Sequence, residues 1–175
     1  MPTYKYIPYE VSRKTKYTAY SPISNKILLA ENLFQKLNNN ETYACLLHEY
    51  GHKKHRKLSI LINLFFVPIA IFSIFLGVLF ISTNNINLVI SVMITPLIIS
   101  VIPYRFLSNR NEYIADDYVK KKGQSKAFVC ALNKIEMENK PSFLKRIDIY
   151  LNLTHPKIED RIKRLNSDHK HQKLK

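Results

Sequence analysis

The residues best suited to chemistry lie in one stretch, Glu41–Lys57, which reads ETYACLLHEYGHKKHRK. It contains His48, Glu49 and His52 in the spacing His-Glu-x-x-His. Side chains four residues apart share one face of a helix, so both imidazoles can bind a single ion. The glutamate between them would lie beside that ion, where its carboxylate can accept a proton from activated water. The pattern is typical of zinc-dependent hydrolysis.

The same stretch has the features of a helix. We expect Asn40 to be the N-cap and Glu41 to lie in the first turn, with basic residues at the C-terminal end. Gly51 costs about 1 kcal/mol relative to alanine inside a helix, so a close neighbour is expected there, either substrate or a packed helix. The alternative interpretation is that His48 and His52 are ordinary histidines of an amphipathic helix.

A catalytic zinc site needs a third protein ligand and an open fourth position. Glu112 and Asp116 lie four residues apart in a helix expected over Phe106–Lys122. There Glu112 could bind the metal, and Asp116 could accept a hydrogen bond from a ligand histidine. His55, one turn beyond His52, is a rival ligand. Acidic pairs are also common on solvated helix faces, so the residues by themselves leave the third ligand open.

A long apolar run separates these two groups of residues. Leu58–Tyr104 contains no Asp, Glu, Lys, Arg or His, although the chain has 27 Lys and Arg and a net charge of +14. The sequence STNNIN at Ser82–Asn87 divides the run into two segments of about 20 residues, each long enough to span a bilayer. A buried hairpin in a soluble protein is the alternative, but a chain of 175 residues has little else to cover it.

The distribution of charge predicts topology and partners. Of the Lys and Arg residues, 10 precede the apolar run, 17 follow it and none lies in its turn, which predicts two spans with both ends in the cytoplasm. The most basic part of the chain, after Lys120, has only Tyr150 to stack on a base, so no nucleic acid is expected. The predicted partners are a lipid bilayer and a protein or peptide substrate. Cys45 and Cys130 form no disulfide framework, and Cys45 is expected in the core.

Three separated motifs, HEYGH, NEYIAD and THPKIEDRIKRL, occur in that order around the apolar run. Together they resemble the gluzincin-type membrane zinc metallopeptidases that include the heat-shock protease HtpX and the CAAX prenyl endopeptidases, over roughly Tyr17–Leu165. The resemblance implies that His48, His52 and Glu112 hold one zinc ion. It also implies that Glu49 is the general base.

The resemblance assigns roles outside the metal helix as well. Asp116 would support the metal site, His155 would stabilise the transition state, and Arg161 would be the companion of that histidine. The family holds its substrate on an edge strand, for which this chain offers the stretch Tyr17–Tyr20, although its sequence differs from the family's Asn-Ala-Phe-Ala type. Members similar to HtpX carry transmembrane segments before the metal helix, and this sequence shows none there.

The expected fold is mainly α with a small β-sheet, in which a transmembrane helical hairpin interrupts a zincin-like metallopeptidase core. Residues 1–57 and 105–165 would form one cytoplasmic, split zinc metallopeptidase domain. Residues 58–104 would form the hairpin, and 166–175 a flexible basic tail. Strands are expected over Val11–Tyr20 and Ile27–Ala30, and a late helix over Ser142–Leu153.

The predicted activity is that of a membrane-bound zinc metalloendopeptidase, which hydrolyses peptide bonds of membrane or cytoplasmic proteins by means of a zinc-activated water. Two other classes stay open from the sequence. One is a catalytically inert membrane scaffold or partner-binding subunit with a zinc site. The other is a basic, membrane-tethered nucleic-acid binder. Four protein ligands would indicate structural zinc, whereas three with an open position would indicate catalysis. The sequence is also compatible with a homo-oligomer.

Overall fold

The computed structural model describes residues 7–13, 18–83, 85–138 and 155–167. The strands are β1 (Glu10–Ser12), β2 (Ala19–Ser21) and β3 (Lys26–Ala30); the helices are α1 (Glu31–Lys36), α2 (Asn39–Lys54), α3 (Arg56–Leu64), α4 (Phe66–Phe80), η1 (Ile81–Thr83), α5 (Ile86–Lys121), α6 (Ser125–Glu138) and α8 (Ile158–Asn166). Helix dominates, and three short strands form one sheet, so the predicted mainly helical α+β class is confirmed. The helix expected over Ser142–Leu153, and the tail beyond Ser167, lie outside the described residues.

The sheet has the strand order β1-β3-β2. β1 pairs in parallel with β3, with Val11 opposite Leu29, and β2 pairs with β3 in antiparallel fashion, with Tyr20 opposite Ile27. The single strand expected over Val11–Tyr20 is therefore wrong. A tight turn with Asn25 at φ 56° lets β2 fill one edge of β3, so β1 can pair only with the other edge.

The N-terminus of α2 is fixed by a capping box. The side chain of Asn38 accepts a hydrogen bond from the Glu41 backbone N–H (2.9 Å), and the Glu41 carboxylate accepts one from the Asn38 N–H (2.8 Å). Asn38, and not Asn40, is thus the N-cap, because only Asn38 stands three residues before the glutamate. The ammonium of Lys134 on α6 donates to the same carboxylate (2.7 Å), which ties α2 to α6.

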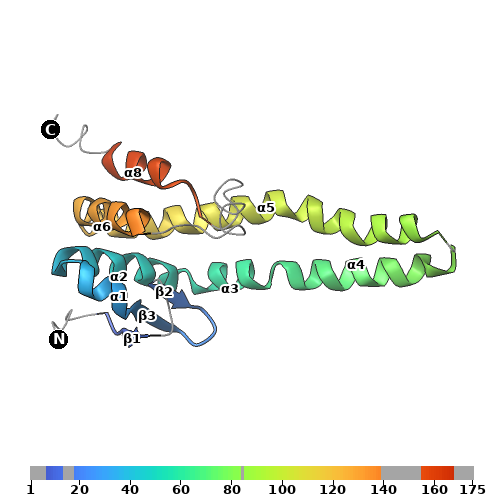
Figure 1. Ribbon diagram of the computed structural model, residues 1–175, viewed down its shortest axis with the longest axis horizontal. Coiled ribbons are helices and arrows are strands. Elements are labelled where there is room, and N and C mark those ends of the chain that lie inside the picture. The colour runs from blue at the N-terminus through green and yellow to red at the C-terminus, as the bar shows by residue number, and fades with distance from the viewer. Residues whose placement is uncertain (1–6, 14–17, 84, 139–154, 168–175) are drawn as a thin grey trace.

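The apolar run forms two long antiparallel helical rods that project from the rest of the fold (Figure 1). One rod consists of α3 and α4 (Arg56–Phe80) and the other is α5, and both are long and apolar enough to cross a membrane. Few of their residues are buried, and Ile71 and Ile98 are each 64% exposed. The rods pack along each other but leave most of their apolar surface exposed, which is the behaviour expected of lipid-facing helices.

α5 is one continuous helix of 36 residues. The residues of the helix expected over Phe106–Lys122 are helical up to Lys121, but the expectation that this helix starts separately, with Ser108 or Asn109 as its cap, is wrong. Asn85 caps α5 instead, and its side chain accepts a hydrogen bond from the Leu88 N–H. No residue there breaks the helix, and Pro103 is accommodated within it. At 1.5 Å per residue, α5 is about 54 Å long, well beyond the ~30 Å of a hydrocarbon core.

α2 and the last turns of α5 lie side by side and approach to backbone contact at one point (Figure 1). A Cβ atom on Gly51 would lie 2.8 Å from the Ala115 Cα atom and 3.2 Å from the Ala115 carbonyl oxygen. Of the two neighbours expected at Gly51, the structure shows the packed helix. The core around this contact is built from buried apolar residues of β3, α1, α2, α5, α6 and α8.

Replacing Gly51 by alanine should push α2 away from α5. The gain in helix propensity of about 1 kcal/mol is outweighed by a clash with backbone, which cannot rotate away. We expect zinc affinity, measured by competition with a chromophoric chelator, to fall about tenfold or more. Gly77→Ala is the matched control, because its Cβ would meet only the flexible Met93 side chain. Unchanged affinity in Gly51→Ala would contradict this role of the contact.

Candidate metal centre

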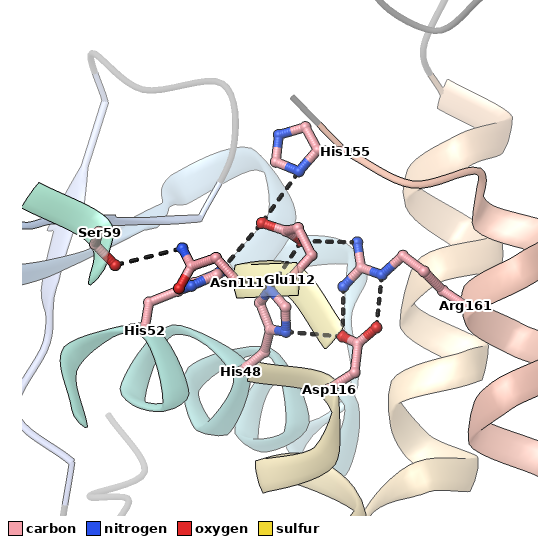
Figure 2. Close-up of polar contacts among 8 residues, drawn as sticks. All are labelled: His48, His52, Ser59, Asn111, Glu112, Asp116, His155 and Arg161. Atoms are coloured by element: carbon pink, nitrogen blue, oxygen red, sulfur yellow. Dashed lines mark hydrogen bonds and ion pairs between the residues drawn. The ribbon is translucent and has the colours of Figure 1, made fainter. Parts of the chain in front are cut away.

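Three buried side chains from two helices converge at the α2–α5 contact (Figure 2). The Nε2 atoms of His48 and His52 lie 3.2 Å apart. The carboxylate of Glu112 on α5 faces both, 3.5 Å from the His48 Nε2 atom and 3.3 Å from the His52 Nε2 atom. One ligand atom from each of the three residues lies within 4.8 Å of the others. The structure thus brings together the three residues that the sequence offered as metal ligands.

Helical spacing explains this convergence. His48 and His52 are four residues apart on α2, and Glu112 and Asp116 are four apart on α5, so each pair lies on one face of its helix. All four side chains are buried. Because α2 and α5 touch at Gly51, the two faces are held opposite each other without an intervening layer of side chains.

A carboxylate–guanidinium pair supports the site from behind. Asp116 lies 3.0 Å from the His48 Nδ1 atom through its Oδ1 atom, so the imidazole is oriented with Nε2 toward Glu112. Arg161 on α8 binds Asp116 in bidentate fashion, at 2.6 and 2.9 Å. Its Nη1 atom also lies 3.3 Å from the Glu112 Oε2 atom. One buried guanidinium thereby balances two buried carboxylates.

These charges set the protonation of the ligand histidine. Burial opposes charge on His48, but the hydrogen bonds to Asp116 and Glu112 outweigh it and raise its pKa to about 9. Burial likewise disfavours the charged form of Arg161, and Glu112 and Asp116 again reverse the effect and raise the guanidinium pKa further. Without a metal, His48 therefore carries a proton at pH 7, and a metal ion must displace that proton when it binds.

His155 reaches the cluster from the segment that precedes α8. Its Nδ1 atom lies 3.2 Å from the Glu112 Oε1 atom, while 64% of its side chain is exposed. It therefore stands at the solvent side of the centre, with Arg161 on the buried side (Figure 2). The late motif thus brings both of its candidate site residues, His155 and Arg161, to Glu112.

The remaining candidates occupy different positions. Glu49 is buried, at 8% exposure, and forms no ion pair or hydrogen bond with another described residue. His55 is exposed and ends α2 as its C-cap, so it does not join the ligand group. Cys45 lies in the hydrophobic core, as expected, where burial raises the pKa of its thiol to about 12 and keeps it protonated.

Two neighbours of the site were not found from the sequence. The ring of Phe128 on α6 stacks on His48 with a centroid distance of 5.0 Å, and the Arg161 guanidinium lies 5.6 Å from the same ring. Asn111 lies beside the ligands and reaches Ser59 of α3 at 3.4 Å. Only helical spacing marks Phe128, as part of an apolar stripe, and that pattern does not distinguish a core residue from a wall of the site.

The donor set fits zinc. Two imidazole nitrogens and one carboxylate are a ligand set of catalytic zinc sites. The Glu112 carboxylate is buried and faces the Nε2 atoms of both histidines, which is the arrangement expected of a carboxylate that shares a cation with two imidazoles. Within the described part of the chain, no fourth His, Cys, Asp or Glu belongs to the group. The described chain therefore offers one ion three ligands, a set that would leave a position for water or substrate.

Arg161→Gln should weaken the zinc-free fold strongly, because it leaves two buried carboxylates without their cation. Loss of one partner of a buried pair typically costs about 3–5 kcal/mol. The matched control is Arg164→Gln on the same helix, since Arg164 forms an exposed pair with Asp117 that is worth about 1 kcal/mol or less. Thermal unfolding in detergent would measure both. Equal loss of stability in the two variants would contradict the proposed charge balance.

Comparison with known proteins supports this interpretation of the site. A protein-family model described as Peptidase family M48 matches residues 1–169, nearly the whole chain. No curated protein and no solved structure matches the chain. Metallopeptidases of this family depend on a metal, typically zinc, and the group of His48, His52 and Glu112 agrees with that dependence. The chain belongs to peptidase family M48 and is a metallopeptidase by that membership.

Proposed function

We propose that this metallopeptidase is a membrane-bound zinc endopeptidase of the HtpX and CAAX prenyl endopeptidase type, which cleaves membrane or cytoplasmic proteins. One observation carries the proposal. Three buried ligands from α2 and α5 converge with no fourth in the described chain, and an unpaired carboxylate, Glu49, is the neighbour in sequence of a ligand. A structural zinc site would be closed by a fourth ligand.

Bound zinc would polarise the scissile carbonyl and lower the pKa of water at the open position towards about 7. Glu49 is the general base. It forms no ion pair or hydrogen bond with another described residue, so its carboxylate is available to accept a proton from the attacking water. It then passes that proton to the leaving amine. Asp116 and Arg161 act through His48 and Glu112, whose orientation they fix.

His155 is the donor to the developing oxyanion. It lies on the solvent side of the ligands and reaches Glu112 at 3.2 Å, so its ring is within reach of a substrate carbonyl placed at the open position. Removal of one such donor typically costs about a hundredfold or more in rate. Arg161 is the positioning residue beside it, because α8 carries the arginine directly after the His155 segment.

The edge of β2 is the proposed place for an extended substrate. β2 pairs only with β3 in the described sheet, so its other edge has no strand partner there, and it packs near the metal helix α2. β2 contains Ala19 and Tyr20 of the stretch expected to bind substrate, whereas Tyr17 lies outside the described residues. A peptide could add to this edge by main-chain hydrogen bonds.

Glu49→Gln should abolish turnover and retain zinc, because it removes the base without removing a ligand. We would compare cleavage of an unfolded model protein by the detergent-purified wild type and variant at equal zinc content. Cleavage by the wild type alone, lost with a chelator and restored by zinc, is the expected result. An active Glu49→Gln protein would contradict the role of Glu49. No cleavage by either protein, with zinc still bound, would favour the scaffold.

We also propose that 58–104 is a two-span hairpin which interrupts one cytoplasmic domain formed by 1–57 and 105–165. The two rods have the required length and exposed apolar surface. The sheet, α1, α2, α6 and α8 gather at the same end of the rods, opposite the turn (Figure 1). All 27 Lys and Arg of the chain lie outside 58–104 in the sequence, which favours the cytoplasmic side for the domain.

Cysteine labelling tests this topology, because the described chain has one buried thiol, Cys45, and one exposed thiol, Cys130 on α6. In sealed cells an impermeant maleimide should leave Cys130 unlabelled until the membrane is opened. In a Cys130→Ala background, Ser82→Cys in η1 should be labelled from outside. Labelling of Cys130 in sealed cells would contradict the cytoplasmic assignment.

A further inference from the structure

A cavity lies away from the metal centre, along α5 and beside Arg164 of α8. Its volume is about 600 Å³, which is within the roughly 300–1,000 Å³ of small-molecule sites. Its wall has an apolar part, formed by Ile102 and Phe106, and a cationic part, formed by Arg105, Arg110 and Arg164. None of the metal ligands lines it, so the metal centre does not account for it.

The part of the cavity that α5 supplies is one stripe of that helix. The stripe begins at Ile102 and continues at helical spacing through Arg105, Phe106 and Arg110. It ends at Tyr113. The metal-binding face of α5, with Glu112 and Asp116, is a different stripe and is buried in the domain. The cavity stripe starts inside the uncharged run and crosses Arg105, the first charged residue after it. It therefore spans the boundary between apolar and polar parts of the same helix.

The three arginines of this wall differ in the contacts that they make. Arg164 pairs with Asp117 at 2.8 Å and lies over the Tyr113 ring at 4.7 Å. Arg105 and Arg110 are exposed and form no ion pair or hydrogen bond with any residue that the structure describes. Two guanidinium groups five residues apart on α5 line the same cavity, and no carboxylate of the described chain is paired to them. They favour an anionic ligand that accepts several hydrogen bonds.

We propose that this cavity binds an anionic glycerophospholipid. The phosphate lies between Arg105 and Arg110, and an acyl chain runs along Ile102 and Phe106 into the bilayer. A phosphate group suits the paired guanidinium groups, and the boundary position of the cavity is that of a lipid headgroup. A soluble anion would leave Ile102 and Phe106 exposed, at 76% and 66%. The proposal rests on the membrane insertion proposed above.

A lipid seated here would contact both helices of the cavity. α5 contributes Arg105 and Arg110, and α8 contributes Arg164. α8 also carries Arg161, one turn earlier, which holds Asp116 and Glu112. The lipid would therefore stabilise the docking of α8 on α5, and the full chain should unfold at a higher temperature when the lipid is bound.

The test compares lipid retention by the full chain with native mass spectrometry, using phosphatidylglycerol as the anionic lipid and phosphatidylcholine as the neutral one. The wild type should retain phosphatidylglycerol at about tenfold lower concentration than phosphatidylcholine. The Arg105→Gln/Arg110→Gln variant should lose that preference and its thermal stabilisation by phosphatidylglycerol. The matched control, Lys126→Gln/Lys163→Gln, removes the same charge at exposed positions outside the cavity and should retain both. Unchanged zinc content would show that the cavity variant is folded.

Equal losses in the two double variants would overturn the proposal, because surface charge would then explain the preference. Suppression of lipid retention by inorganic phosphate, or by an acidic peptide, would also overturn it, since the cavity would then recognise a soluble anion. The lipid measurement needs neither zinc nor turnover, so Glu49→Gln should behave as the wild type. The lipid site and the proposed protease activity can therefore fail independently, and cysteine labelling tests membrane insertion separately.

Discussion

The approach of α2 and α5 to backbone contact at Gly51 is the constraint on which the rest of the structure depends. His48 and His52 come from one of these helices and Glu112 from the other, so their separation is fixed by the distance between the two backbones. Any Cβ at Gly51 would move that distance, because it would meet the backbone of Ala115. The packing of α2 against α5 therefore determines the geometry of the three candidate ligands.

Bringing the helices so close buries two carboxylates beside two imidazoles, and this arrangement needs a compensating charge. Arg161 supplies it from α8, an element that is distant in sequence but docks against α5. The same segment brings His155 to the solvent side of Glu112. The negative charge of Glu112 and Asp116 thus holds α8 against the site through Arg161. The segment before α8 then places His155, the candidate donor to the transition state, beside Glu112.

α5 connects the proposed membrane anchor to the metal centre without a break. Its first half has the composition of a lipid-facing helix, and its second half carries Glu112 and Asp116. Between them lies the boundary where Arg105 and Arg110 border a cavity shared with α8. Because a helix is stiff along its axis, the depth of the proposed anchor in a bilayer would set the height of the ligands above its surface.

The sequence by itself determined what depends on local spacing: the helical pairing of His48 with His52, the apolar run, the helical class and the need for a close neighbour at Gly51. The sequence placed the N-cap of α2 at Asn40, because three consecutive asparagines offer more than one start for the helix. It also joined β1 and β2 into one strand, because a short polar run does not show where a strand ends. It also missed Phe128, whose contact with His48 joins two helices far apart in the chain. Only the tertiary structure decided which carboxylate meets the histidines, that Arg161 balances it, and that His55 stands aside. Those outcomes depend on distances between separate elements. Packing sets these distances, and the spacing of residues along one helix does not determine them.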